Sequence, residues 1–468
     1  MKKFIIYILT IFAISACTNQ FDEINTNKNQ PTNAGPKFLL PSVIFNLANN
    51  SVYAAFDFGE IISQYGGDYE YNASDIYNWG PDSRFWDLYE NLHDVKDIEK
   101  QAIADGNQNY QAVALVLGSY MTSILTDSYG PVPFTEANQS EDGIYAPKYD
   151  SQESIYNNIL DNLTQANSLF DTNSSIDGDI LFQGDMLKWK KFCNSLHVRL
   201  LMRISNKEDV SQRLSEILSN PSLYPLFESN NDNAIYKYSG VFPDISPRSN
   251  GNGREYEYHI VVPTTHLVNL LVDNNDPRLN EWIDPSAASN SYIGLQPGLP
   301  LDQIGEPANY ARRADSYFES ASKISAIFMT YSELNFLLAE ARERNIINLS
   351  TAQNFYNKAV QASFEQWGVN MPSDYLTTTA PYNNTNDVLY EQKWLALYHT
   401  GVEAWFDWKR TGKPSFITPG PGAQNDGLVP RRLIYPSIEQ SVNNTNYQQA
   451  AQSIGGDNIN AKVWWDNF

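Results

Sequence analysis

Apolar side chains recur at helical spacing through long stretches of this chain, and this spacing decides its fold class. In residues 109–129 they fall on one helix face, at Tyr110, Val113, Leu117, Met121 and Ile124. Residues 186–204 show the same spacing, at Trp189, Phe192, Leu196, Leu200 and Ile204. Apolar positions three to four residues apart indicate amphipathic helices, whereas strands would alternate with a period of two. The sequence therefore predicts a mainly α fold.

The predicted helices occur as neighbouring pairs. The pairs cover residues 83–104 with 108–128, 151–170 with 186–206, and 324–345 with 350–367, and a further helix covers 387–408. Ser350 and Gln353 have the spacing of a capping box at the start of the last paired helix. Pairs of this size are typical of tetratricopeptide hairpins, although the motif does not repeat at a fixed period of about 34 residues. We therefore expect tetratricopeptide-like pairs rather than a regular solenoid.

Long irregular segments separate the helical pairs. Residues 66–82, 239–262, 284–322 and 413–436 are rich in Gly, Pro, Asn and Tyr. Loops of this length are uncommon in a compact domain unless they are functional or disordered, and their aromatic content argues against disorder. We expect one helical domain over residues 37–468, with loop-rich excursions that form a ligand face.

The N-terminal residues predict export and lipidation. Lys2 and Lys3 precede a short apolar run, which ends in small residues directly before Cys17. This layout indicates a secretory signal over residues 1–16 with a lipobox, and a diacylglycerol on the Cys17 thiol. Residues 17–36, rich in Asn, Thr and Pro, are interpreted as a flexible tether. The alternative is a periplasmic protein without a lipid anchor.

Cysteine content and charge limit the remaining possibilities. Cys193 is the one other cysteine, so a lipidated chain has no internal disulfide and must depend on a large core. Cys193 itself is expected to be a buried thiol. The formal net charge is −22, which argues against nucleic acid and against anionic membrane surfaces as partners.

A search for catalytic and cofactor motifs finds none. There is no phosphate-binding glycine loop and no Gly-x-Ser-x-Gly elbow, and the five histidines lack metal-binding spacing. We therefore expect no enzyme activity, no cofactor and no motif-based metal site, although calcium stays possible without a motif. A carboxylate pair for glycoside hydrolysis also stays open among the 54 acidic residues.

The segment between Gln64 and Trp86 is the clearest candidate for binding. It carries aromatic side chains interleaved with Asn and Asp, among them Tyr69, Tyr71, Asn72, Tyr77, Trp79 and Asp82. Tyr and Trp combine apolar area with a polar group, so they stack on the C–H faces of a sugar while amides and carboxylates bind its hydroxyls. The same composition suits an extended peptide, or a loop that packs its own aromatic rings for rigidity.

Several long motifs resemble one family. They are FDEINTN at residues 21–27, LTDSYGPVP at 125–133, YEQKW at 390–394, EAWFDWKRTG at 403–412 and RRLIYP at 431–436. In this order they resemble the SusD-like (SusD/RagB) nutrient-binding lipoproteins, in particular the second SusD-like subgroup. The resemblance covers nearly the whole chain.

The resemblance implies a scaffold of four tetratricopeptide-like pairs and a binding function without catalysis. It implies a lipid-anchored lid, facing the cell exterior, that delivers oligosaccharide or peptide to a SusC-like TonB-dependent transporter of the outer membrane. Less favoured alternatives are a surface glycoside hydrolase and a structural adaptor.

The resemblance also implies a role for individual residues. Aromatic residues of the early loop and the mid-chain excursion would form the ligand platform, namely Tyr69, Tyr71, Tyr77, Trp79, Tyr292, Tyr310, Tyr317 and Phe318. In contrast, Trp394, Trp405 and Trp408 are interpreted as scaffold packing, and Lys393 and Arg410 as ion-pair partners of nearby acids.

Overall fold

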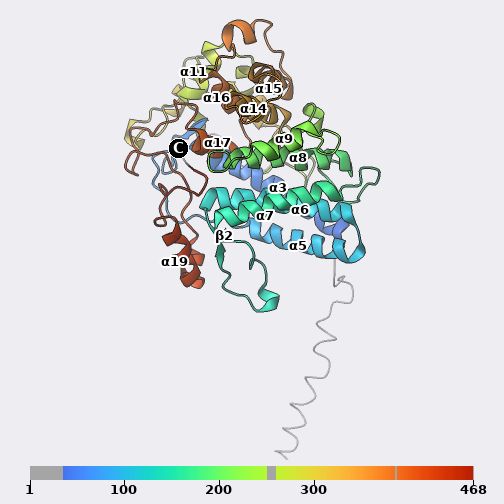
Figure 1. The fold of residues 1–468 in the computed structure, drawn as a ribbon. Helices are drawn as coiled ribbons and strands as arrows, with labels where there is room; N and C mark the ends of the chain where they lie inside the picture. The colour runs from blue at the N-terminus through green and yellow to red at the C-terminus, as the bar shows by residue number, and fades with distance from the viewer. Residues whose placement is uncertain (1–34, 250–259, 385–386, 467–468) are drawn as a thin grey trace, which may run out of the picture.

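The structure is a computed structural model that describes residues 35–249, 260–384 and 387–466. Layered helices form one part of the molecule, and irregular segments extend from them (Figure 1). The predicted signal over residues 1–16, the lipidation at Cys17 and all but the last two residues of the predicted tether lie outside the described residues.

The first half of the chain forms a stack of long helices (Figure 1). They are α3 (Pro36–Ala54), α5 (Leu88–Asp105), α6 (Gln108–Tyr129), α7 (Gln152–Leu169) and α8 (Met186–Ile204). Helix α3 packs on α5, α5 on α6, α6 on α7, and α7 on α8. The two predicted pairs are thus confirmed, and they join into one continuous layer.

Side-chain caps explain where three of these helices begin. The side chains of Asn107, Ser151 and Asp185 accept hydrogen bonds from the backbone N–H three residues later. Such caps satisfy one of the N–H groups that the first turn of a helix leaves without a partner.

The second helical group contains α14 (Tyr331–Glu343), α15 (Ala352–Gln366), α16 (Val388–Ala396) and α17 (Glu403–Thr411). Helix α14 packs on α15 and α8, and α16 packs on both α14 and α15. The predicted mainly α scaffold of helical pairs is therefore confirmed.

Three local predictions in this group are wrong. The start of the predicted helix 324–345 is strand β8 (Ser325–Met329), because it pairs with β4 (Ala234–Lys237). The predicted helix 387–408 is two helices, since His399 and Gly401 adopt positive φ angles of 61° and 60°, which right-handed helix excludes. The cap of α15 is Thr351, which accepts from the Asn354 N–H, and not Ser350.

Within the described residues, four two-stranded antiparallel sheets connect parts of the irregular segments. The pairs are β1 (Gly66–Asp68) with β5 (Val261–Pro263), β2 (Val132–Pro133) with β3 (Tyr149–Asp150), β4 with β8, and β6 (Ile283–Asp284) with β7 (Arg312–Arg313). Shorter helices complete the fold: α4 (Glu60–Ile62), α9 (Ser211–Ser219), α11 (Thr265–Asp273), α12 (Leu279–Trp282), α13 (Asp315–Phe318), α18 (Ser437–Val442) and α19 (Asn444–Ser453). Single 3-10 turns lie at Ser140–Asp142, Asn230–Asp232, Leu301–Gln303 and Pro307–Asn309, and π-helical turns at Ala55–Gly59 and Tyr375–Thr379.

The core confirms several predictions about single residues. Cys193 is fully buried, its thiol lies 3.3 Å from the Leu163 carbonyl, and burial raises its pKa. Trp394, Trp405 and Trp408 are buried in the scaffold. Within the described residues, no helix is both long enough and apolar enough to span a membrane.

A network of buried ion pairs lies within the second helical group and joins it to α8. Arg410 donates to both carboxylate oxygens of Glu340, and Lys393 Nζ lies 2.6 Å from the Asp407 carboxylate. Arg199 of α8 pairs with Glu333 of α14 at 2.5 Å. The predicted ion-pair roles of Lys393 and Arg410 are therefore confirmed.

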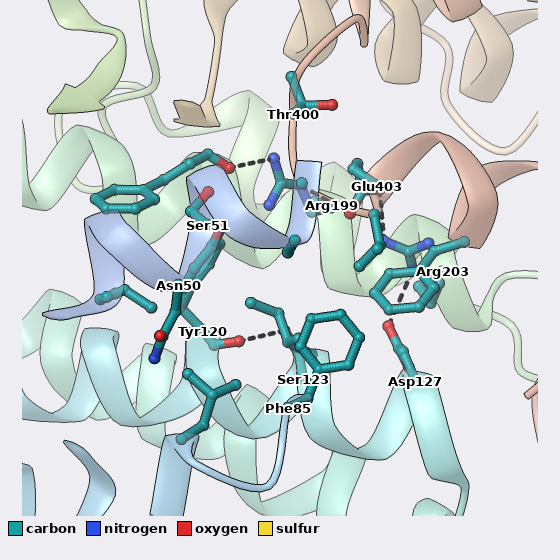
Figure 2. A pocket seen from close by; sticks show the side chains of 18 residues that line it. Asn50, Ser51, Phe85, Tyr120, Ser123, Asp127, Arg199, Arg203, Thr400 and Glu403 are labelled. Carbon is teal, nitrogen blue, oxygen red and sulfur yellow. Dashed lines mark hydrogen bonds and ion pairs between the residues drawn. The ribbon is translucent and has the colours of Figure 1, made fainter. Parts of the chain in front are cut away.

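A cavity of about 30 Å³ lies beside this network, among α3, α6, α8 and α17. Figure 2 shows Arg199 and Arg203 pointing toward Glu403, with Asp127 beside Arg203. This volume is about that of a single water molecule. The cavity therefore belongs to the packing of the core and is too small for a sugar ring.

Replacement of Glu340 by Gln tests the buried network. The change removes one of the two carboxylates, Glu340 and Asp407, that compensate the buried Arg410 and Lys393, so we expect a loss of about 3–5 kcal/mol in the free energy of unfolding. Urea denaturation followed by circular dichroism measures it. The matched control is Asp161→Asn, which removes an acid that is 79% exposed from its pair with Arg213. An equal urea midpoint for E340Q and D161N would contradict the role of the network.

Candidate functional site

Three loops that are distant in sequence meet on one side of the molecule. They are residues 66–82, 292–300 and 418–424, and we call their meeting point the three-loop junction. Strand β1 of the first loop pairs with β5, and the Tyr69 N–H extends this ladder to the Ile260 carbonyl at 3.1 Å. The Asn72 side-chain amide donates to the Leu299 carbonyl at 2.7 Å. The predicted early loop and mid-chain excursion are thus in direct contact.

Glycines allow the loops to approach closely. A Cβ atom on Gly420 would lie 2.1 Å from the Pro297 carbonyl oxygen, and Gly298 has a φ of +64°, a conformation that favours glycine. Backbone hydrogen bonds connect the Gly422 N–H to the Gly298 carbonyl at 2.8 Å and the Gln424 N–H to the Ile76 carbonyl at 2.7 Å. The junction is therefore a preformed unit rather than three independent loops.

Two buried carboxylates shape the base of the first loop. One Asp68 oxygen accepts from the N–H groups of Glu70 and Tyr71, both at 2.8 Å. Both oxygens of Asp75 lie 3.3 Å from the Asp68 N–H. Burial raises the pKa of Asp75 well above its usual range, the Asp68 N–H opposes this, and the Asp68 charge raises it further.

The loop base presents two tyrosines to solvent. Tyr71 is 63% exposed, whereas Tyr69 is half-buried. The Asp68 carboxylate fixes the turn that carries Tyr71, because it accepts the Tyr71 N–H. Among the predicted site residues, Tyr71 offers the most accessible aromatic surface.

Trp79 lies half-buried at the edge of an aromatic cluster. Its ring packs edge-on against Phe58, Tyr77 and Trp405, with centroids 5.1–6.4 Å apart. Its indole N–H donates to the Ser74 carbonyl at 3.1 Å. Trp79 therefore combines a packing role with a partly exposed edge.

The polar members of the predicted set hold the loop in shape. Asn72 is buried and its amide serves the Leu299 contact. The Tyr77 hydroxyl is buried and accepts from the Gln64 side chain at 3.2 Å. The Asp82 carboxylate accepts from the backbone and side chain of Arg84.

The mid-chain aromatic residues separate into two groups. Tyr292 and Tyr310 are half-buried near the surface; the Tyr292 hydroxyl is 3.2 Å from Asn280 Oδ1, and the Tyr310 hydroxyl accepts from the Gly305 N–H. Tyr317 and Phe318 are buried because α13 turns its apolar side toward the core, where they contact Phe56, His399 and Trp367. Phe318 has no exposed surface for a ligand.

Sequence reasoning gave no residue of the third loop a role in the site. Its signal is the run Pro419-Gly420-Pro421-Gly422, in which two glycines alternate with rigid prolines. Only the structure shows that this run lies against Gly298.

In the part of the chain described, the acidic residues at the base of the junction contact the loop's own backbone. No group of three or more His, Cys, Asp or Glu side chains suited to a metal ion occurs there. The oxygens of Asp68 and Asp75 face backbone N–H groups, and both side chains are buried. The arrangement is suited to holding a loop that binds.

Comparison with known proteins places the chain in a family. Residues 28–436 match the SusD-like family model described as starch-binding and associating with the outer membrane. This chain belongs to the SusD-like family. A comparison with curated proteins gives no match.

Solved structures agree with this assignment. A SusD homolog of Bacteroides fragilis is 25% identical, with a TM-score of 0.82 over 92% of this chain and 100% of its own. A chitin-binding protein is 27% identical, with a TM-score of 0.79 over 93% of this chain and 100% of its own. An outer membrane protein of Bacteroides vulgatus that is connected with nutrient binding is 26% identical, with a TM-score of 0.80 over 93% and 100%.

Replacement of Asp75 by Asn tests the electrostatics of the loop base. Folding raises the pKa of Asp75, so the folded state holds the Asp75 proton more tightly than the unfolded state does. The contribution of Asp75 to the free energy of unfolding therefore falls as the pH rises above the unfolded pKa of about 3.9. D75N removes this loss. We expect a higher urea midpoint than the parent at pH 8 and no such gain at pH 4.

The matched control is Asp302→Asn, which removes the same charge from an exposed position. A D75N midpoint that differs from the parent by the same amount at both pH values would contradict the raised pKa of Asp75.

Proposed function

We propose that this SusD-like protein is a cell-surface lipoprotein that captures oligosaccharide and delivers it to a SusC-like TonB-dependent transporter of the outer membrane. The observation that carries the proposal is the exposed Tyr71 ring on a loop held by Asp68, Asn72 and the glycine contacts of the junction. A ligand platform that is already ordered loses little entropy when it binds.

The chemistry of the junction suits a neutral sugar. Tyr71, the half-buried Tyr69 and the half-buried Trp79 offer flat apolar area, and the same loop carries Asn and Asp side chains. The starch-binding description of the family and the chitin-binding relative support a saccharide ligand. Peptide is the alternative cargo, because an extended peptide also binds to aromatic surfaces.

The remaining parts of the proposal concern location. Signal cleavage after residue 16 and lipidation at Cys17 would attach the domain to the outer membrane, in agreement with the description of the family. Delivery to a transporter and exposure at the cell exterior follow from the family resemblance. Loss of membrane attachment in a Cys17→Ser variant, measured by cell fractionation, would support the anchor.

Replacement of Tyr71 by Ala tests the binding site. Loss of the exposed ring should weaken glycan binding by roughly 1–3 kcal/mol, the range of an aromatic anchor, and should leave the urea midpoint unchanged. Isothermal titration of the chain from Thr18 onward measures this against chitin and starch oligosaccharides and against peptides. The described fold begins at Gly35, so this truncation keeps every described residue.

Tyr145→Ala is the matched control, since Tyr145 is 80% exposed and lies outside the three loops. Equal affinity in the parent and Y71A would remove Tyr71 from the site. Peptide binding in place of glycan binding would change the cargo class, and shortened sugar products in the calorimeter cell would favour a hydrolase. Trp79→Ala is a less specific test, because the ring also packs against Trp405.

A further inference from the structure

A wider cleft opens outside the three-loop junction. It has a volume of about 660 Å³ and lies between the β4–β8 sheet, the start of α8 and the end of α15. None of its lining residues belongs to the three loops. Pockets that bind small molecules have volumes of about 300–1,000 Å³, so the cleft is large enough for several sugar rings.

One face of the β4–β8 sheet forms a wall of this cleft. Side chains of a strand alternate between its two faces, and the cleft face carries Ile235, Lys237, Ser325 and Ile327. In the ladder, Ile235 is opposite Ile327 and Lys237 is opposite Ser325. The other face, with Tyr236, Ala326 and Phe328, is buried in the core. The wall therefore places an apolar pair beside a polar pair.

Amide side chains line the neighbouring turn. The Asn230 amide donates to the Ala362 carbonyl at 2.9 Å, and Asn233 Oδ1 accepts from the Tyr331 N–H at 2.6 Å. Asn231, between them, is exposed at the cleft. Two of the three amides are thus fixed in position by the scaffold, and they hold the third at the opening.

Two polar atoms at the end of α15 have no hydrogen-bond partner within the described chain. They are the indole N–H of Trp367 and the side-chain oxygen of Gln366, both buried, and both residues line the cleft. Buried polar groups in proteins nearly always have a hydrogen-bond partner, so each exception requires a physical reason. A donor and an acceptor on consecutive residues of the cleft lining could each serve a ligand hydroxyl.

Lysine side chains give the cleft a local charge opposite to that of the whole chain. Lys188, Lys237 and Lys323 line it, against Glu281 and Glu365. Across the described ranges, none of these three lysines has an ion-pair partner within 4.0 Å, whereas the chain as a whole carries a net charge of −22. The cleft therefore favours an anionic group.

We propose that this cleft is a second binding site, which takes an acidic oligosaccharide whose sugar rings carry carboxylates. The half-buried Trp367 supplies aromatic surface, the amides supply hydroxyl contacts, and the three lysines pair with carboxylates. A peptide strand is disfavoured as the ligand, because the sheet presents its face and not a free edge to the cleft. The site is independent of the neutral-sugar platform around Tyr71.

The test is calorimetric titration of the chain from Thr18 onward with oligogalacturonate and oligoguluronate. The same oligomers after chemical reduction of their carboxyl groups serve as neutral counterparts. We expect binding of at least one acidic oligomer, and binding at least tenfold weaker for its reduced form. The variant K188Q/K237Q/K323Q should lose at least tenfold in affinity, and Trp367→Phe, which keeps a ring but removes the indole N–H, should bind several-fold more weakly.

Two controls distinguish binding in this cleft from a general charge effect and from binding at the three-loop junction. K100Q/K207Q/K358Q removes the same charge from exposed lysines outside the cleft and should bind like the parent, and Y71A should also bind like the parent. Failure of both acidic oligomers to bind would overturn the proposal. Equal losses of affinity in the two triple variants would show that the net charge, and not the cleft, determines binding. A loss of affinity in Y71A alone would assign the acidic ligand to the three-loop junction.

Discussion

The burial of charged side chains within the second helical group, and between this group and α8, is the constraint on which the rest of the structure depends. Ions removed from water are tolerated only with well-placed partners, and Glu340 has three in Arg410, Lys393 and Arg344. These contacts fix α14, α16 and α17 relative to one another. Arg199 connects α8 to the same group, through Glu333 and the Phe328 carbonyl. The helical layers therefore have one relative position, not several of similar energy.

The binding loops take their position from this scaffold. The Trp394 indole N–H of α16 donates to the Ser63 carbonyl at 2.9 Å, and the Tyr65 hydroxyl donates back to the Trp394 carbonyl at 2.5 Å. The two rings also stack, with centroids 4.1 Å apart. These contacts hold the chain directly before β1, so the order of the core extends to the turn that carries Tyr71. Scaffold tryptophans would thus support the proposed platform without contact with a ligand.

The sequence predicted the helices because their periodicity is local, and it predicted the ion-pair roles of Lys393 and Arg410 because acids lie nearby in the same segment. It did not predict the break at His399. There the backbone adopts a positive φ angle that no local sequence pattern indicates. Nor could the sequence distinguish Tyr71 from Tyr77. Both are loop tyrosines, but Tyr77 is buried by a contact with Gln64, and the loop is positioned by a bond between residues 227 apart, Asn72 and Leu299.

The net charge is another sequence property that does not predict a single site, because it describes the whole chain. A charge of −22 disfavours acidic cargo at long range, because like charges repel. At physiological ionic strength, however, the Debye length is about 8 Å, so distant surface acids contribute little inside a cleft. The lysines that line the wall then determine the local potential. One acidic protein can therefore offer a platform for neutral sugars and, separately, a site for an anionic sugar.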